Sequence, residues 1–535
     1  MLVVFCWPWV LGPSLTVVPF AVGLLAVALA GMVLRPAMPL APLGWLGAVV
    51  GVAWLSGGGD NEAKAGLLAA AAACGVMLAI GRTARSQRSI TQAFITALLL
   101  AMVLHVAVAW LQFFDLERAF HPFANLNPTS RPYGNLRQSN HLASFALLGL
   151  LAVWWRHRRG LDERTVTAAL AALAYSGVAL SGSRTGLLAT VAVSVGLLLL
   201  QRRSSRFEWC VFLAGPLWVA VVTFALPHLP TPGGLDPAAM MMRSNDSLSV
   251  RLTYWSEAWE LALRHPLLGV GWSELGRARF EQLPPQAGLE NTVNAHNLVL
   301  HLLAEVGFAG AIVFLAPVVW LLWRQHPWRM VSASAAQATG SVADRIDLTW
   351  AWLLLTVVGL HSMAEYPLWY MPFLIPTAFA FGLLMGGPPD THGRSLPGQA
   401  VAAAAGALLL CTVLALMDYA QVSTAYGPSG RSLEDPARAL AVQKTVLFRR
   451  YADRALLERV PTTPENTPQM LTATARLLSA GPTTLLLWVR LSALCDTGQT
   501  SPARALASRL ETLFPAAHAQ FVKLKDPAAL VRCGL

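Results

Sequence analysis

Charge is scarce in this chain of 535 residues. Asp, Glu, Lys and Arg together make up 13% of it, whereas apolar side chains make up 55%. Soluble globular domains carry about 25% charged residues, so this composition excludes a soluble globular protein. The mean hydropathy of +0.52 indicates lipid as the solvent for much of the chain. Continuous apolar runs, in place of ten-residue alternating ones, favour membrane-spanning helices over a barrel.

Lysine is also rare, although the formal net charge is +11 and the isoelectric point is near 9.8. This balance could suggest nucleic acid as a partner. However, the arginines that carry it stand in short loops between apolar runs. That placement is typical of a membrane-orientation signal, so no nucleic-acid partner is expected.

Metal-ligand patterns are absent from the sequence. Four of the six cysteines lie in or beside apolar segments without metal-ligand spacing: Cys6, Cys74, Cys210 and Cys411. Cys495 and Cys533 lie in the polar C-terminal region and could form a disulfide if that region is exported. No outward loop carries an Asp-x-Asp pair or a His/Asp cluster, so no metal or other cofactor is expected. The first apolar stretch lacks a basic start, so no cleavable signal peptide is expected.

Long apolar runs are what the chain does contain, and they predict about twelve transmembrane helices. Each run is close to the ~20 residues that cross a hydrocarbon core of roughly 30 Å. The runs lie near residues 14–34, 39–55, 65–81, 90–114, 140–156, 165–181, 186–201, 208–226, 297–323, 347–364, 367–386 and 400–418. We therefore expect an all-α polytopic membrane protein with a transmembrane domain at 1–418.

The loops between these runs alternate in character. One set carries arginines and, by the positive-inside rule, is cytoplasmic: Arg35, Arg82, Arg85, Arg88, Arg156, Arg158, Arg159, Arg164, Arg202, Arg203, Arg206, Arg324, Arg329 and Arg394. The other set is rich in Asn, His, Ser and Gly and includes a long loop at 227–296. This alternation predicts that the polar residues gather on the face opposite the arginine-rich loops.

The long loop begins with a Pro- and Gly-rich stretch at 227–237, which breaks helices. Leu252, Trp255, Trp259 and Leu263 then recur at helical spacing, which predicts an amphipathic helix at the membrane surface. After about residue 419 the chain turns polar, with short helical patterns separated by Pro and Gly. We expect a helical domain at 419–535, outside the cytoplasm, in which 488–515 is loosely like a tetratricopeptide unit.

Two outward segments begin or join predicted spans with polar residues. RPYGNLRQSNHLASF contains Arg137, Gln138, Asn140 and His141. Ser139 or Asn140 could cap the helix, or these donors could hold an anionic headgroup at its positive end. In SGSRTG, Arg184 lies between two apolar runs and would cost about 2.5–3.5 kcal/mol if it faced lipid. It therefore needs an ion-pair partner, water or a phosphate ligand.

Three further segments complete the candidate site. Arg251 starts the amphipathic helix and alone would be a surface charge. In NTVNAHNLVLHLLAEVGF, a neutral imidazole at His296 could accept a hydroxyl proton, with the amides of Asn294 and Asn297 fixing its tautomer, or it could be a polar anchor. In HSMAEYPLWY, the aromatics fit a membrane-interface belt, but the carboxylate of Glu365 requires a partner such as an arginine.

Six segments in order resemble the motifs of the bacterial O-oligosaccharyltransferases, within the O-antigen ligase and polymerase superfamily. They are GNLRQSNHLA at 134–143, SGSRTG at 181–186, RLTYW at 251–255, HPLLGVGW at 265–272, NAHNLVLHLLAEVG at 294–307 and HSMAEYPLWY at 361–370. The resemblance covers nearly the whole chain, although part of the first span is missing at the amino terminus. It implies a GT-C-like fold in the bacterial inner membrane, with the active site on the periplasmic face.

The resemblance also implies an activity and roles for residues. It implies inverting, metal-independent transfer of an oligosaccharide from undecaprenyl diphosphate, in the membrane lipid, to Ser or Thr of periplasmic proteins such as pilins. His296 would activate or orient the acceptor hydroxyl, and Arg184 and Arg251 would stabilise the departing diphosphate. The predicted substrate-binding residues are Arg137, Gln138, Asn140, His141, Asn294, Asn297, Glu365, Tyr366 and Tyr370.

Two alternatives stay open. An O-antigen ligase or polymerase would share the arginines and His296 but would transfer the glycan to a sugar. A lipid or glycan transporter would also place polar groups in the membrane, although it predicts polar residues in mid-span rather than at one face.

Overall fold

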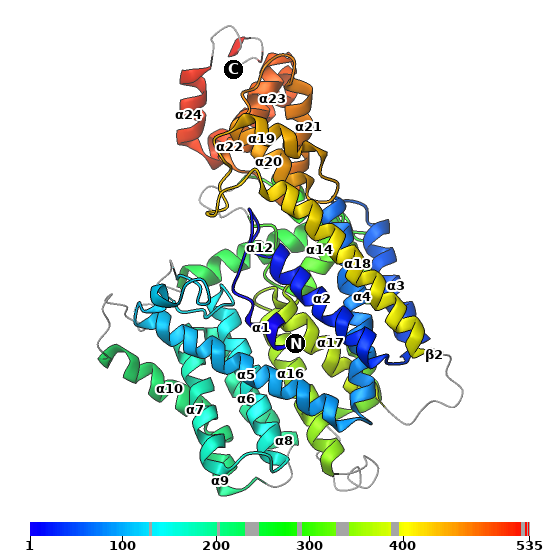
Figure 1. Ribbon diagram of the computed structural model, residues 1–535. Coiled ribbons are helices and arrows are strands. Elements are labelled where there is room, and N and C mark those ends of the chain that lie inside the picture. Colours follow the sequence, from blue (N-terminus) through cyan, green and yellow to red (C-terminus); the bar gives the residue numbers. More distant parts are fainter. Residues whose placement is uncertain are drawn as a thin grey trace.

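The computed structural model is almost wholly helical (Figure 1). It describes residues 1–127, 131–200, 204–229, 245–285, 292–327, 342–386, 395–525, 530–531 and 533, apart from the side chains of 245–248 and 342. Helices hold 76% of the chain, and the strands of the described residues are two-residue segments, β1 (Met38–Pro39) paired with β2 (Ser395–Leu396). The expected all-α architecture is therefore confirmed.

A bundle of helices forms the larger part of the protein. Its α-helices, up to residue 423, are α1 (Leu2–Cys6), α2 (Val17–Leu34), α3 (Leu40–Leu55), α4 (Asn61–Ala84), α5 (Arg88–Phe113), α6 (Ser139–Arg158), α7 (Arg164–Ser181), α8 (Arg184–Leu200), α9 (Arg206–Glu208), α10 (Gly215–Ala225), α12 (Asn245–Arg264), α13 (Leu275–Gln282), α14 (Leu298–Gln325), α16 (Val342–Ser362), α17 (Met371–Met385) and α18 (Gly398–Ser423). Its short 3-10 and π turns are η1 (Glu117–Phe120), η2 (Trp209–Leu213), η3 (Leu226–His228) and η5 (Pro367–Trp369).

Every apolar run that predicts a span coincides with helical structure. Among the described residues, five helices are long and apolar enough to cross a membrane: α2, α4, α5, α14 and α18. A sixth span results if the bent pair Arg206–Leu213 and Gly215–His228 is counted as one, and α3, α8 and α17 are apolar but shorter. By length and composition, the described residues confirm a multi-pass membrane protein, whereas a total of twelve spans stays a prediction.

Helix α6 lies at the centre of the bundle and gives it two distinct ends. Fifteen of its twenty residues are buried, and it packs against α5, α7, α8 and α16. A helix of this length spans about 30 Å, the thickness of a hydrocarbon core. Asn140 and Arg158, at its two termini, therefore lie on opposite sides of such a layer.

The arginine-rich end of the bundle is held by ion pairs. Arg156 pairs with Asp162 at 2.7 Å, Arg158 with Glu208 at 2.9 Å and Arg159 with Asp347 at 2.5 Å. This end includes α9, which lies farthest from the C-terminal helices in Figure 1. Four arginines of the predicted cytoplasmic set lie outside the described residues, as does most of the Pro- and Gly-rich stretch: 202, 203, 329 and 394.

The predicted amphipathic helix is confirmed as α12. Leu252, Trp259 and Leu263 are 53%, 45% and 57% exposed, so one of its faces is apolar and uncovered. The opposite face packs against α14 through Ala258 and Leu261, which are buried. An apolar face of this kind is suited to lie in a membrane interface.

Local sequence signals explain where the elements around the site begin and end. The Asn297 side chain accepts a hydrogen bond from the amide of Leu300 at 3.1 Å and so caps α14. Helix α7 ends at Gly182, whose φ of +55° is the left-handed conformation that glycine tolerates. Helix α14 is broken at Gly307, with a φ of +67°, where a Cβ would lie 2.4 Å from the backbone of Leu267.

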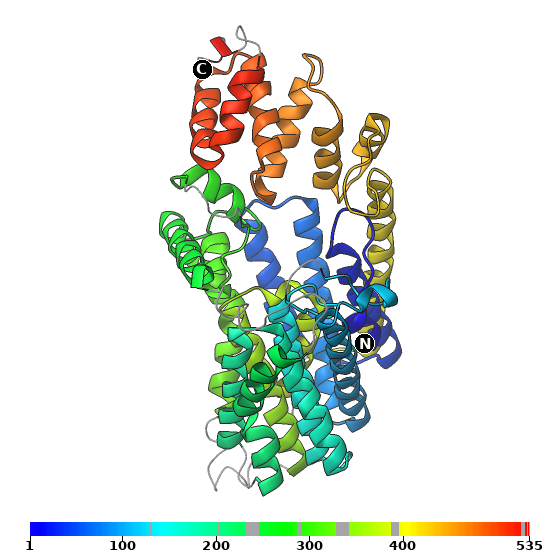
Figure 2. The same ribbon diagram turned by 90° about the vertical axis from the view of Figure 1, so that its left-hand side faces the viewer.

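Helix α18 connects the bundle to the C-terminal helices and continues to Ser423, past the boundary predicted after residue 418. The C-terminal elements are α19 (Pro436–Ala441), η6 (Val442–Lys444), α20 (Arg449–Arg459), α21 (Thr467–Leu477), η7 (Leu478–Ala480), α22 (Thr484–Asp496), α23 (Thr500–Leu513) and α24 (Pro515–Leu524). From α20 to α24, each α-helix packs on the next. These helices stack beyond one end of the bundle (Figure 2).

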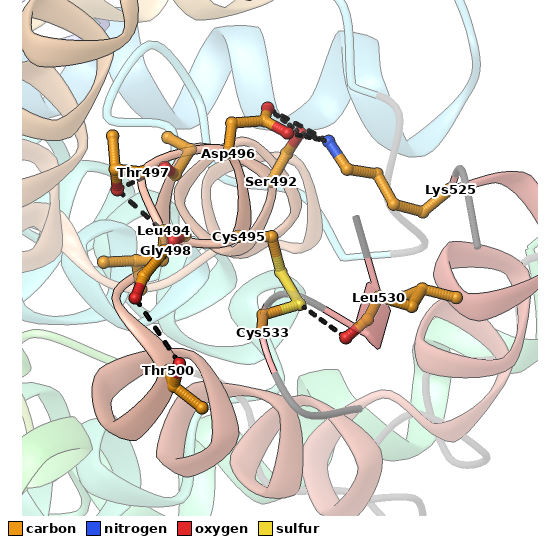
Figure 3. Close-up of a disulfide and its surroundings, with 11 residues drawn as sticks. Ser492, Leu494, Cys495, Asp496, Thr497, Gly498, Thr500, Lys525, Leu530 and Cys533 are labelled. Atoms are coloured by element: carbon orange, nitrogen blue, oxygen red, sulfur yellow. Dashed lines mark hydrogen bonds and ion pairs between the residues drawn. A yellow bond between two sulfur atoms is a disulfide. The ribbon is translucent and has the colours of Figure 1, made fainter. Parts of the chain in front are cut away.

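A disulfide closes the C-terminal helices. Cys495 and Cys533 are bonded, with Cα atoms 4.7 Å apart, so the pairing that the sequence left open is formed (Figure 3). Beside it, Lys525 donates to Asp496 at 2.9 Å and to the hydroxyl of Ser492 at 2.6 Å. Structural disulfides persist in oxidising compartments, so this bond fits a region outside the cytoplasm.

Candidate active site

The carboxylate of Glu365 is the centre of a polar cluster at the end of the bundle opposite the arginine pairs. It stands in the turn between α16 and η5, with its side chain 4% exposed. Its Oε1 accepts hydrogen bonds from Arg251 Nη2 at 2.6 Å and from Asn140 Nδ2 at 3.1 Å. Its Oε2 lies 2.7 Å from Nδ1 of His296. Four predicted site residues, separated by up to 225 positions in sequence, therefore meet at one carboxylate.

This cluster keeps Glu365 ionised. Burial raises the pKa of its carboxyl, but the hydrogen bond from His296 and the charges of His296, Arg251 and His361 lower it further, to about 2. The carboxylate is thus an acceptor only, and Nδ1 of His296 must carry the proton that joins them. In the neutral form of the ring, the lone pair is then on Nε2.

His296 is held from several sides. Its amide donates to Oδ1 of Asn294 at 2.8 Å. Its ring is nearly parallel to that of Tyr254, with centroids 6.0 Å apart, and meets the ring of Tyr366 edge-on at 5.2 Å. Its φ of +50° is left-handed, a strained conformation for a residue with a Cβ. Such strain persists where the surroundings enforce it and is typical of functional sites.

The predicted tautomer-fixing role of the flanking amides is wrong. Asn297 caps α14, and its Nδ2 donates to the carbonyl of Met363 at 3.4 Å. Asn294 holds the backbone of His296 rather than its ring. The tautomer is fixed by Glu365, which comes from a different part of the sequence.

Asn140 connects this cluster to the SGSRTG turn. Its Oδ1 accepts a hydrogen bond from the hydroxyl of Ser183 at 2.8 Å. Helix α6 starts without a side-chain cap, so the alternative that Asn140 or Ser139 serves as its N-cap is wrong. Arg184 follows Ser183 directly, begins α8 and is exposed. The turn therefore joins the cluster through Ser183, the residue before Arg184.

Arg131 is a further cation near Glu365 that the sequence motifs did not indicate. Its guanidinium donates to the carbonyl of Ser181 from Nε at 2.9 Å and from Nη2 at 2.7 Å. Burial and the charge of Arg251 lower the pKa of Arg131, and Glu365 raises it. Mutual influence of this kind places the two arginines within electrostatic range of the same carboxylate.

Arg137 is not brought into the cluster. Its guanidinium donates to the carbonyls of Leu15 at 3.0 Å and Pro8 at 2.5 Å, and to Oδ1 of Asn125 at 3.4 Å. Gln138, the residue before α6, has its Oε1 buried without a hydrogen-bond partner among the described residues. Of these two, Gln138 is the better placed to receive a ligand.

His141 and the predicted tyrosines form the inner wall behind Glu365. His141 is 1% exposed, and its ring lies 4.5 Å from that of Tyr370 and 5.4 Å from that of His361, measured between centroids. Tyr366 stacks on Tyr370 at 6.0 Å. Burial and the charge of Glu365 raise the pKa of Tyr366, which keeps its phenol protonated and able to donate.

The donor set of the cluster suits an anion. It combines guanidinium groups, amides and an imidazole around one carboxylate that is already engaged. Among the residues that the structure describes, no three His, Cys, Asp or Glu side chains are grouped to hold a metal ion. Inside α14, Nε2 of His301 lies 3.4 Å from Oε2 of Glu305, which also accepts a hydrogen bond from the amide of Ser273 at 2.9 Å, so this pair joins α14 to a neighbouring segment.

Sequence-family models match three parts of the chain. A protein glycosylation ligase model matches 132–157, an O-antigen ligase model matches 168–315, and a model for the C-terminal part of virulence factor membrane-bound polymerases matches 349–529. Asn140 lies in the first segment, Arg251 and His296 in the second, and Glu365 in the third. The four residues that meet in space are therefore drawn from all three matched segments.

Two proteins of Acinetobacter baylyi are similar to the chain. Its general O-oligosaccharyltransferase is 26% identical over 299 residues, which cover 54% of this chain and 50% of that protein. Its ComP-specific O-oligosaccharyltransferase is 24% identical over 266 residues, which cover 48% and 44%. The chain thus spans about half the length of these relatives. These similarities confirm the resemblance that the six motifs indicated.

Proposed function

We infer from these similarities that the chain is an O-linked oligosaccharyltransferase of the O-antigen ligase superfamily. We propose that it moves a preassembled oligosaccharide from undecaprenyl diphosphate, in the membrane, to a Ser or Thr hydroxyl of a periplasmic protein such as a pilin. The reaction is proposed to invert the anomeric centre and to need no metal ion.

The observation that carries this proposal is the 2.7 Å contact between Nδ1 of His296 and Oε2 of Glu365. An ionised carboxylate on Nδ1 directs the lone pair of the imidazole to Nε2 and stabilises the imidazolium that forms when Nε2 takes a proton. The same logic operates in Asp-His pairs of hydrolases. His296 is 21% exposed, so its free edge can meet an acceptor hydroxyl.

The transfer step follows from this arrangement. The acceptor oxygen attacks the anomeric carbon as Nε2 of His296 accepts the hydroxyl proton, and the bond from that carbon to the diphosphate oxygen breaks. The electron pair leaves on the lipid diphosphate, whose negative charge increases. Arg251 and Arg184 stabilise that charge, and Arg131 adds to it, because preorganised cations act strongly where water is sparse.

The remaining residues have proposed binding roles. Gln138 and Asn140 hold the phosphates or the first sugar, and the unpaired Oε1 of Gln138 supports a hydrogen bond to a ligand. Tyr366 and Tyr370 line the entrance for the acceptor or lipid. The cluster is positioned by Asn294, Asn297 and His141. Arg137 is proposed to bind substrate from the loop before α6.

The proposed topology places this cluster on the periplasmic face of a bacterial inner membrane. It comprises twelve spans in a GT-C-like fold at 1–418 and a periplasmic, tetratricopeptide-like helical domain at 419–535. The arginine pairs at the opposite end and the Cys495–Cys533 disulfide support that orientation.

Reconstitution tests donor, acceptor and metal dependence together. The purified chain is mixed with a lipid-linked oligosaccharide and a candidate pilin in the presence of a chelator, and the glycosylated product is measured. We expect transfer by the wild-type chain and by His228→Ala, an exposed histidine outside the cluster, and a loss of about 10²–10⁴-fold in His296→Ala. Undiminished transfer by His296→Ala would refute the mechanism.

An O-antigen ligase with a sugar acceptor is the second candidate. The O-antigen ligase model covers 168–315 and includes Arg184, Arg251 and His296. Mass spectrometry of pilins and lipopolysaccharide profiles of a deletion strain separate the two: loss of pilin glycan supports protein transfer, and loss of capped lipopolysaccharide supports the ligase.

A further inference from the structure

Helix α13 lies between the His296 cluster and the C-terminal helices and packs on both. Leu275 and Ala278 are buried in a cluster with Ala295, the neighbour of His296. On its other side, Phe280 packs against the core of the C-terminal helices. At Gly276, a Cβ would lie 2.9 Å from Val293, which precedes His296 by three residues, and 3.0 Å from the carbonyl oxygen of Ser479 in η7.

Arginines join α13 and the C-terminal helices in both directions. Arg277 of α13 donates to the carbonyl of Ala475, at the end of α21, at 2.7 Å. In return, Arg509 of α23 donates to the carbonyls of Phe280, Glu281 and Leu283, the last two at 3.0 Å, and its guanidinium lies over the Phe280 ring at 5.5 Å. Cations that satisfy the last carbonyls of a helix stabilise its C-terminus, so each part supports the end of a helix in the other.

Arg279, on the same helix, faces the cluster. Its side chain is 10% exposed, and it pairs with Glu257 of α12 at 2.6 Å. It donates to the carbonyl of Thr292 at 2.7 Å, and its guanidinium lies 4.8 Å from the centroid of the Tyr254 ring. This one guanidinium therefore joins α12, α13 and the segment that leads into His296.

Two of the three partners of Arg279 lead to His296, Tyr254 by direct contact and Thr292 through Asn294. Tyr254 stacks on the imidazole. The hydroxyl of Thr292 accepts from the amide of Asn294 at 3.2 Å, and Oδ1 of Asn294 accepts from the amide of His296 at 2.8 Å. The left-handed φ of His296 requires such restraints, because that conformation is unfavourable by itself.

We propose that the C-terminal helices set the geometry of His296 through α13, with Arg509 and Arg279 as positioning residues at the two ends of this connection. The inference rests on the proposed function for its effect on transfer. A change at Arg509 shifts α13, which moves Arg279 and releases the Tyr254 ring and the Thr292–His296 segment. Binding of the acceptor protein to the C-terminal helices can change the geometry of His296 through the same contacts.

A double-mutant cycle tests the connection in the full-length, reconstituted protein. Arg279→Lys, Arg509→Ala and the double variant are compared with wild type for kcat and for KM of the donor. Arg438→Ala is the matched control, because Arg438 is 55% exposed and pairs within the C-terminal helices with Asp435. Arg509→Lys keeps the positive charge without the planar guanidinium, and it serves as the second variant if Arg509→Ala fails to fold.

Because Arg279 and Arg509 are proposed to act through the same contacts, their substitutions should have related effects on kcat. Each single variant lowers kcat by about 2- to 30-fold, the usual range for coupling of this kind, with little change in donor KM. The double variant loses no more than the more affected single variant, because both changes release the same contacts. Losses that multiply in the double variant, or a wild-type kcat in Arg509→Ala, would overturn the proposal.

Hydrogen exchange supplies a readout that needs no turnover, so it separates this inference from the proposed function. In Arg509→Ala, the amides of Asn294 and His296 should exchange faster than in wild type, although they lie in a different part of the sequence. Arg438→Ala should leave them unchanged. Equal exchange in Arg509→Ala and wild type would contradict the connection even if the chain transfers no glycan.

Discussion

The two ends of α6 differ in how their arginines are paired. At one end, Arg156, Arg158 and Arg159 each have a carboxylate of their own. At the other end, Glu365 alone serves Arg251, His296 and Asn140, and Arg131 lies within electrostatic range of it. The three arginines at the first end are therefore each balanced by a carboxylate, whereas Arg251 and His296 share one carboxylate at the other.

This difference separates structural arginines from functional ones. A buried guanidinium with its own carboxylate is compensated, and it holds helices together. Cations that share one carboxylate leave donors and positive charge for an incoming anion, such as a diphosphate. The sharing of one carboxylate thus supports, independently of any motif, the proposal that a charged substrate binds at this cluster.

The largest expected effect comes from removing the shared charge. Glu365→Gln should lower kcat by about 10³–10⁴-fold, because an amide no longer fixes the Nδ1–H tautomer or stabilises the imidazolium, as in carboxylate-to-amide changes in catalytic triads. Asp347→Asn, at the balanced end, should lower Tm and leave kcat within twofold. Steady-state kinetics and melting curves of both variants give the comparison. Equal losses of kcat would show that the two ends do not differ in function.

Arginine geometry gives the next largest effect. Arg251→Lys should lower kcat by about 10²–10³-fold, because lysine cannot bond Glu365 and a diphosphate through one planar fork. Arg158→Lys should retain activity, since its partner needs only a nearby positive charge. A transfer assay at saturating donor compares the kcat values of these two variants. A fully active Arg251→Lys would show that Arg251 is merely an ion-pair partner.

The lowered pKa of Glu365 predicts a pH-dependent stability difference. Its carboxyl has a pKa of about 2 in the folded protein, below the ~4.3 of an unfolded chain, so it stabilises the fold above that value and loses the contribution as the pH falls toward 2. The Tm of wild type should exceed that of Glu365→Gln above about pH 5. The gap should narrow steadily on acidification, and a constant gap would contradict the ionised cluster.

The smallest effect on transfer is expected from the disulfide. It closes a segment with a sequence separation of 38 residues, for which a cross-link contributes about 3–4.5 kcal/mol. Cys495→Ser should therefore lower the stability of the C-terminal helices, measured by thermal unfolding or proteolysis. Transfer at 25 °C should change less than in the Glu365 and Arg251 variants, because the bond is not part of the Glu365 cluster.

The sequence predicted the elements better than their contacts. The apolar runs coincide with helices, and the spacing of Leu252, Trp255, Trp259 and Leu263 predicted α12, because periodicity reports which face of a helix is apolar. Trp255 alone of the four is partly buried. The pairing of Glu365 with an arginine was also predicted, since an uncompensated carboxylate is costly at a membrane interface.

Contacts between distant segments could not be predicted from the sequence. Ser183 and Tyr254 lie inside the motifs, yet nothing in their spacing tells that one bonds Asn140 and the other stacks on His296. Arg137 stands one turn before Asn140, but its left-handed φ of +60° and its contacts with Leu15 and Pro8 belong to another part of the fold. Local patterns do not encode such partners, which depend on how helices pack.

The affinity of the purified protein for a lipid-linked diphosphate donor tests the difference between the two ends most directly. It is measured for wild type, Arg251→Ala and Arg158→Ala. Hydrogen bonds to charged groups contribute about 1.5–3 kcal/mol, so Arg251→Ala should weaken binding by about 10-fold or more, and Arg158→Ala should bind as wild type does. Equal affinities of all three proteins would contradict a diphosphate site at Glu365, Arg251 and His296.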